Sequence, residues 1–167
     1  TAVKDAKSAL RIVQGAGMPA NAGILVDALH FGRSTTTLDD IRAIPRELLH
    51  YAQIGDAQAG LNFSTEQMIH TARCERLLPG EGNIDLQGLF AALPADLPVS
   101  VEVVNLGREA NTSAQEWAAK CMGATLRTTQ SLETSQVTRG AKVALSTGAP
   151  KNNCDAGTFN ANKADRT

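Results

Sequence analysis

Within residues 22–27 a continuous apolar run ends at Asp27, and two later apolar-rich segments, residues 49–54 and 99–104, repeat the arrangement with polar residues inside them. A run of Ile, Leu and Val without alternating polar residues is typical of a parallel strand that is buried on both faces. The pattern therefore predicts three parallel strands in these segments.

Segments with helical spacing or helix-capping signals separate the runs. The predicted helices cover residues 2–14, 35–43, 64–76, 85–93 and 113–127. Two of them begin with the spacing of a capping box, at Ser64–Gln67 and at Ser113–Glu116. Alternating strands and helices require right-handed crossovers, so the sequence predicts an α/β fold with a parallel sheet.

The character of the chain changes at residue 128. Residues 128–167 are rich in Ser, Thr, Asn and Gln and contain few large apolar side chains. Such a segment buries too little apolar surface to offset the entropy lost on ordering. We therefore predict one domain at residues 1–127, followed by a polar, flexible tail at 128–167.

Composition narrows the class of protein. The 167 residues suit one modest domain and are too few for a complete eight-stranded barrel of typical size. A net charge of −1 argues against a nucleic-acid or membrane-surface partner. Three scattered cysteines fit reduced thiols better than a disulfide framework, and no signal segment follows Thr1. These features predict a cytoplasmic protein.

Polar side chains lie at or near the end of each predicted strand. Asp27 follows the first run, Gln53 lies in the second, and Glu102 lies between Val101 and Val103 in the third. Because neighbouring parallel strands lie about 4.8 Å apart, we expect these side chains to converge at one edge of the sheet. A carboxylate within an apolar strand is costly unless it is paired or binds a metal. Oxygen ligands of this kind predict Mg²⁺ or Mn²⁺.

Four short motifs then follow one another in order. They are D-x-x-H (Asp27, His30), Q-x-x-D (Gln53, Asp56), the string RLLPGEGNID at residues 76–85, and V-x-V-E-V with Glu102. Together they resemble the xylose isomerase-like TIM-barrel superfamily over about residues 1–127. That superfamily includes sugar phosphate isomerases and epimerases, inosose dehydratases and 3-dehydroshikimate dehydratases. The resemblance implies that the chain is the C-terminal portion of a (β/α)8 barrel.

The resemblance also implies roles for single residues. In the superfamily, one residue from each of the last four barrel strands binds the metal, and Asp27, Gln53 and Glu102 match the last three. The fourth ligand, a glutamate one β/α unit earlier, has no counterpart in this chain. His30 and Arg76 match substrate-binding positions, and Glu102 is a candidate general base. A partial barrel has open sheet edges, which favour self-association.

The implied function is a divalent-metal-dependent isomerase or epimerase. It would act on a small polyhydroxylated carbonyl compound, a sugar or sugar phosphate, through an enediolate. Many epimerases of the superfamily have histidine where this chain has Gln53, so a 3-dehydroshikimate dehydratase-like lyase is an alternative. A catalytically inactive, truncated or domain-associating piece is another. The superfamily's endonucleases acting on abasic DNA need histidine-rich sites and a basic face, which this chain does not show.

Several candidates have a purely structural alternative. Asp27 suits a helix cap, and His30 suits a structural histidine. Arg76 has acidic neighbours in Glu75 and Glu81, with which it could form ordinary surface ion pairs.

Overall fold

The computed structural model describes residues 3–133 and 143–145. A parallel sheet lies at its centre. Its strands follow the order β1 (Val26–Asp27), β2 (Ala52–Ile54), β3 (Val99–Val101) and β4 (Val143–Leu145). The first three strands confirm the predicted segments and their parallel pairing, although each strand is shorter than its apolar run.

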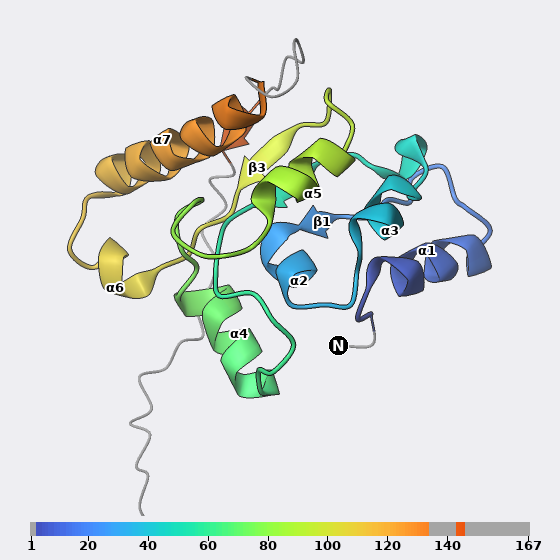
Figure 1. Cartoon of the computed structure of the whole chain (residues 1–167), viewed down its shortest axis with the longest axis horizontal. Coiled ribbons are helices and arrows are strands. Elements are labelled where there is room, and N and C mark those ends of the chain that lie inside the picture. The colour runs from blue at the N-terminus through green and yellow to red at the C-terminus, as the bar shows by residue number, and fades with distance from the viewer. Residues whose placement is uncertain (1–2, 134–142, 146–167) are drawn as a thin grey trace, which may run out of the picture.

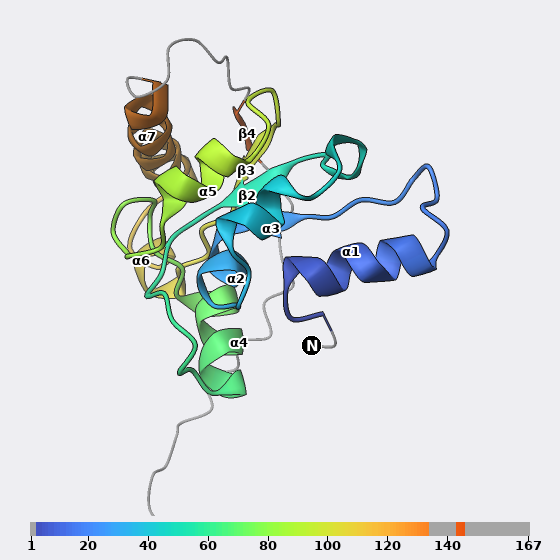
Figure 2. The same ribbon diagram turned by 45° about the vertical axis from the view of Figure 1, so that its right-hand side comes forward.

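Two groups of helices flank this sheet. The first group connects one strand to the next and packs side by side; it comprises α3 (Leu38–Arg42), α5 (Leu86–Ala92) and α7 (Ala114–Glu133). The second group leaves the C-terminal ends of β1, β2 and β3; it comprises α2 (Ala28–Gly32), α4 (Thr65–Cys74) and α6 (Leu106–Glu109). In Figures 1 and 2 the second group lies lower than the first. The remaining elements are α1 (Ala6–Gly15) and the 3-10 helix η1 (Arg46–Leu48).

Helices begin where the capping signals predict. Ser64 and Gln67 cap each other's backbone N–H groups at the start of α4. Ser113 and Glu116 do the same before α7. Helix α1 begins later than predicted, because the Asp5 side chain caps it at that point.

The sheet buries one face against the helices and exposes part of the other. On the covered face, Val26, Ala52 and Val99 are at most 5% exposed. On the opposite face, Leu25 and Tyr51 are 46% and 42% exposed. The prediction of burial on both faces is therefore wrong at these positions, because no layer covers them within residues 3–133 and 143–145. In a closed barrel the corresponding face points inward and is filled by side chains.

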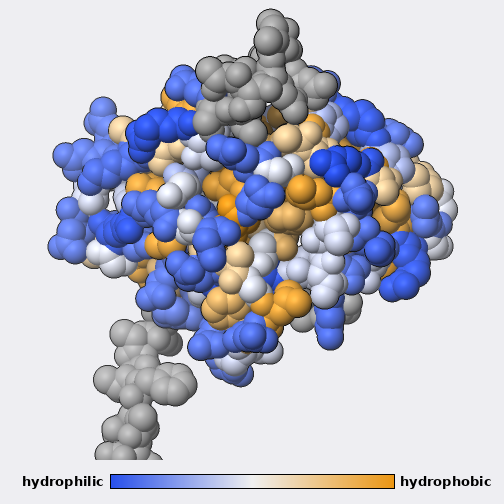
Figure 3. Space-filling model, in the orientation of Figure 1, coloured by the Kyte–Doolittle hydropathy of each residue, from blue (hydrophilic) through white to orange (hydrophobic). Residues whose placement is uncertain are grey.

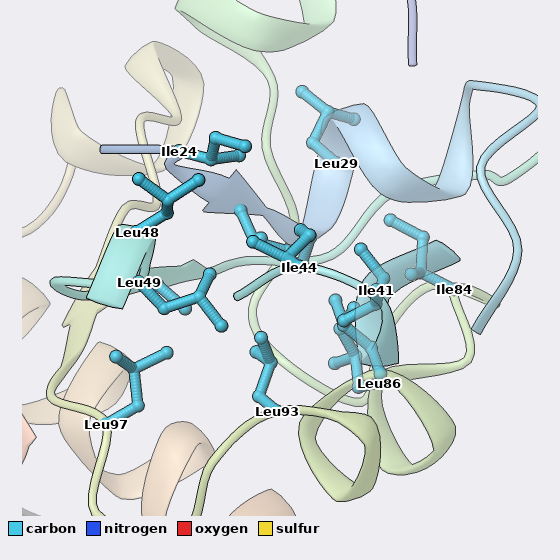
Figure 4. Packing of buried hydrophobic residues seen from close by; sticks show 14 of the residues in the cluster. Ile24, Leu29, Ile41, Ile44, Leu48, Leu49, Ile84, Leu86, Leu93 and Leu97 are labelled. Atoms are coloured by element: carbon cyan, nitrogen blue, oxygen red, sulfur yellow. The ribbon is translucent and has the colours of Figure 1, made fainter. Parts of the chain in front are cut away.

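The larger part of the core packs between the sheet and helices α2, α3 and α5 (Figure 4). Its labelled members are Ile24, Leu29, Ile41, Ile44, Leu48, Leu49, Ile84, Leu86, Leu93 and Leu97. A second cluster around Val101 and Cys121 joins β2 and β3 to α7. Cys121 is a free thiol, and burial raises its pKa to about 11. Cys74 is disulfide-bonded, so the expectation of reduced cysteines is wrong for this residue.

The structure extends into the segment that the sequence predicts as a flexible tail. Helix α7 crosses the predicted boundary at residue 127 and ends at Glu133. Residues 143–145 form β4, which pairs with β3. The remainder of the predicted tail lies outside the described residues.

The described surface is mixed in polarity. The face in Figure 3 shows hydrophilic residues around its periphery and hydrophobic residues exposed between them. Within the described part of the chain, no helix is both long enough and apolar enough to cross a membrane.

Candidate active site

The three residues predicted to bind a metal lie at one edge of the sheet. Asp27 ends β1 and is in register with Gln53 on β2. Glu102 directly follows β3, and its backbone N–H donates to the carbonyl oxygen of Ile54 at 2.9 Å. The C-terminal ends of three adjacent strands thus bring these side chains to neighbouring positions, as the sequence predicts.

Arg76 joins the two carboxylates into one polar network. Its Nη1 lies 2.8 Å from Oδ2 of Asp27, and its Nη2 lies 3.4 Å from Oε1 of Glu102. Its Nε donates to the carbonyl oxygen of Ala72 at 3.1 Å. Gln53 completes the network, because its Nε2 donates to Oε2 of Glu102. We call Asp27, Gln53, Arg76 and Glu102 the Arg76 network.

The Arg76 network is buried at one end and accessible at the other. The side chains of Arg76 and Asp27 are 4% and 5% exposed, whereas that of Glu102 is 35% exposed. Arg–carboxylate contacts in a site that excludes water are stronger than surface ion pairs. Two carboxylates and one guanidinium leave one formal negative charge in the network. Glu102 is thus the most exposed of the three charged members.

The alternative pairing of Arg76 with its neighbours in sequence is wrong. Glu81 instead pairs with Arg108 at 2.6 Å, and Glu75 pairs with His70 at 3.2 Å. The Arg76 side chain turns toward the sheet edge, where it meets two carboxylates that are distant in sequence.

Asn105 fixes the backbone from which Arg76 reaches the edge. Its Nδ2 donates to the carbonyl oxygen of Arg76 at 3.0 Å, while the Arg76 N–H donates to the carbonyl oxygen of Val104 at 2.8 Å. Asn105 also caps α6 by accepting the N–H of Arg108 at 3.1 Å. Sequence analysis missed this residue, although it ends the third apolar run as Asp27 ends the first.

His30 lies in the first turn of α2. Its backbone N–H donates to Oδ1 of Asp27 at 3.2 Å. Asp27 therefore also caps this helix, which is the structural role that the sequence offered as an alternative for Asp27. The His30 residue is exposed, and its ring takes no part in the Arg76 network. The structure therefore brings Asp27, Gln53, Arg76 and Glu102 together and leaves His30 at their margin.

Asp56 anchors a loop rather than joining the Arg76 network. Its carboxylate is 1% exposed and accepts the N–H groups of Ala57 at 2.8 Å, Gly80 at 3.0 Å, Gly82 at 2.9 Å and Ile84 at 3.3 Å. These bonds hold the loop before α5 against the end of β2. The acid of the Q-x-x-D motif therefore has a structural role here.

This anchoring leaves no room for a side chain at Gly82. A Cβ there would collide with the carbonyl oxygen of Ala57 and the carboxylate of Asp56. We expect Gly82→Ala to lower the free energy of unfolding by about 1 to 3 kcal/mol, as overpacking does. Urea denaturation measures this change. Gly107→Ala is the control, because the nearest atom to its Cβ would be 3.8 Å away. Equal stability of both variants would contradict the tight packing of the loop.

The side chains at this edge include oxygen donors of the kind that divalent cations bind. Asp27, Gln53 and Glu102 offer the oxygen ligands that Mg²⁺ and Mn²⁺ prefer. Both carboxylates already face one cation, the guanidinium of Arg76. In the described residues, no group of three or more His, Cys, Asp or Glu side chains is arranged to hold a metal ion. The donor types therefore suit a hard divalent cation, whereas their arrangement in this structure, with both carboxylates paired to Arg76, forms no metal site among the described residues.

Comparison with known proteins bears on the fold. No protein-family model and no curated protein match the chain. The solved structure of the IolI protein with a binding zinc atom superposes with a TM-score of 0.64 and 21% identity, covering 81% of this chain and 46% of that one. A fusion of a xylose isomerase-like TIM barrel with 4-hydroxyphenylpyruvate dioxygenase superposes with a TM-score of 0.63 and 23% sequence identity. This match covers 83% of this chain and 23% of the fusion protein. The chain thus spans less than half the length of either protein. The chain shares the fold of a portion of the xylose isomerase-like TIM barrels.

Proposed function

We propose that this chain carries the substrate-binding edge of a sugar or sugar-phosphate isomerase or epimerase. The observation that carries the proposal is the Arg76 network at the C-terminal ends of three parallel strands. In TIM barrels this edge holds the active site. The fold shared with the IolI protein supports the same placement.

The proposal includes a divalent cation, for which Mg²⁺ and Mn²⁺ suit the oxygen donors best. Asp27, Glu102 and the side-chain oxygen of Gln53 would hold it. When bound, such a cation polarises the carbonyl and hydroxyl oxygens of a substrate and so acidifies the adjacent C–H bond. Gln53 presents its nitrogen to Glu102 in this structure, so its amide would have to turn to offer oxygen.

The protein side chains then have separate tasks. Glu102 is the candidate general base, since its carboxylate is the accessible end of the network. It removes the proton beside the substrate carbonyl and returns it to the neighbouring carbon or to the other face, through an enediolate. Arg76, once released from a carboxylate, donates hydrogen bonds to a substrate oxygen. His30 is exposed beside the same edge and can bind a substrate hydroxyl.

Two other functions are consistent with the same observations. A 3-dehydroshikimate dehydratase-like lyase would use the same base and then lose a β-hydroxyl group instead of recovering the proton. Gln53 in place of histidine favours this alternative by resemblance. An inactive, domain-associating piece is favoured by the ion pairs that Arg76 forms with both carboxylates.

Exchange of substrate hydrogen with solvent separates these functions. In D₂O with Mn²⁺, we expect deuterium to appear beside the carbonyl of a ketose or ketose phosphate, followed by NMR. Glu102→Gln should slow this exchange by about 10²- to 10⁴-fold, because it removes the base. Arg42→Gln is the control, since Arg42 is 52% exposed in a surface pair. Dehydration of 3-dehydroshikimate without ketose exchange would favour the lyase. Absence of both reactions would favour the inactive piece.

A further inference from the structure

Arg33 is a buried cation without an anionic partner in the described part of the chain. It follows α2 directly and is 8% exposed. Its Nε donates to the carbonyl oxygen of Gln58 at 3.0 Å, and its guanidinium carbon lies 3.9 Å from the centre of the Phe63 ring. Its Nη1 is buried and has no hydrogen-bond partner. No carboxylate of the described residues forms an ion pair with it.

Arg33 lacks the carboxylate partners that Arg76 has in the described part of the chain. Both arginines are more than nine-tenths buried, but Arg76 contacts the carboxylates of Asp27 and Glu102. Burying a guanidinium without a counter-ion costs free energy, and burial accordingly lowers the pKa of Arg33. The stacking on Phe63 offsets part of this cost but supplies no acceptor for Nη1.

Arg33 lies at the same edge of the molecule as the Arg76 network. Helix α2 begins immediately after Asp27, and Arg33 is one turn beyond His30. A helical rise of about 1.5 Å per residue puts the Arg33 backbone roughly 9 Å from that of Asp27. Gln58 and Phe63 belong to the segment between β2 and α4, which leaves the C-terminal end of the sheet (Figure 1). Asp27 and Arg33 thus flank one short helix at this end of the sheet.

We propose that Arg33 binds the anionic group, a carboxylate or a phosphate, of a substrate whose carbonyl end lies at the Arg76 network. The position of the carbonyl end rests on the proposed function; the anion site itself does not. Arg is suited to both anions because its planar donors match their oxygen pairs. Nη1 is covered in this conformation, so the segment around Gln58 and Phe63 has to move to admit the anion. One backbone bond, from the Gly60 N–H to the Gly32 carbonyl oxygen at 2.9 Å, ties this segment to α2.

Anion titrations without metal test this inference apart from catalysis. Inorganic phosphate and acetate are titrated separately by NMR, and a ketopentose is compared with its 5-phosphate by calorimetry. We expect at least one of the two anions to bind. Comparing the affinities for phosphate and acetate shows whether the site prefers a phosphate or a carboxylate. Arg33→Gln should weaken binding at least tenfold, and Arg33→Lys should weaken it less because it keeps the charge. Arg42→Gln should leave it unchanged, since Arg42 is exposed.

Each outcome decides the proposal. Equal anion affinity in wild type and Arg33→Gln would overturn it, as would failure of the wild-type protein to bind either anion. If Arg33→Gln does not fold, as judged by circular dichroism, Arg33→Lys decides: anion affinity below that of Arg42→Gln, with a native spectrum, would support the proposal, and affinity equal to that of Arg42→Gln would overturn it. Arg33-dependent anion binding in a protein that fails the deuterium exchange assay would leave the anion site standing and remove only the proposed function.

Discussion

Replacing Arg76 by glutamine should lower the free energy of unfolding by about 3 to 5 kcal/mol, the range for breaking a buried ion pair from one side. The variant leaves the Asp27 carboxylate, 5% exposed, without the guanidinium that lies 2.8 Å away, and Glu102 loses its partner at 3.4 Å. Urea denaturation at neutral pH measures the effect. Arg108→Gln is the control, because the pair of Arg108 and Glu81 is about 40% exposed and should contribute about 0 to 1 kcal/mol.

Mn²⁺ should restore part of the stability that Arg76→Gln loses. A ligand that binds only the native state raises its stability, and a divalent cation can take the place of the guanidinium between Asp27 and Glu102. The melting temperature of the variant should therefore rise with added Mn²⁺ more than that of the wild type.

If Arg76→Gln were as stable as Arg108→Gln, the Arg76 network would not be the buried ion pair described here.

Asp56→Ala is the second substitution with a large expected effect, again about 3 to 5 kcal/mol. Four backbone N–H groups, those of Ala57, Gly80, Gly82 and Ile84, would lose a charged acceptor that is 1% exposed. Each hydrogen bond to a charged group contributes about 1.5 to 3 kcal/mol, and unsatisfied buried donors add a cost. Asp56→Asn should be less severe, because one oxygen remains.

Thermal unfolding followed by circular dichroism compares the Asp56 variants with Asp96→Asn. Asp96 is 76% exposed and pairs with Arg46 at 3.0 Å, so its substitution should leave the stability nearly unchanged. Stability of Asp56→Ala equal to that of Asp96→Asn would show that the loop before α5 does not depend on the Asp56 carboxylate.

The strands and most of the Arg76 network could be predicted from the sequence. Apolar-rich segments separated by helical signals predict parallel strands, and polar residues at matching places in successive segments predict that Asp27, Gln53 and Glu102 converge. The partners of Arg76 could not be predicted in this way, because the contacts join residues 49 and 26 positions apart in the chain. From the sequence alone, an ion pair of Arg76 with a neighbour such as Glu75 was the simpler expectation.

Other features depend on tertiary context that local patterns do not carry. The exposure of Leu25 depends on whether another layer covers its face of the sheet, which an apolar run does not reveal. The burial of Arg33 depends on Gln58 and Phe63, which are at least 25 positions away. Helices α2 and α6 are too short for a periodic signal and are set by the caps of Asp27 and Asn105.

Titration of Mn²⁺ into the protein, followed by calorimetry or water-proton relaxation, tests most directly whether Asp27, Gln53 and Glu102 form a cation site. We expect one weak site, because three protein ligands leave the remaining positions of a hard cation to water and Arg76 competes for both carboxylates. Glu102→Ala should abolish binding, whereas Asp96→Asn, at an exposed pair, should not change it. Undiminished Mn²⁺ affinity in Glu102→Ala would contradict the proposed site.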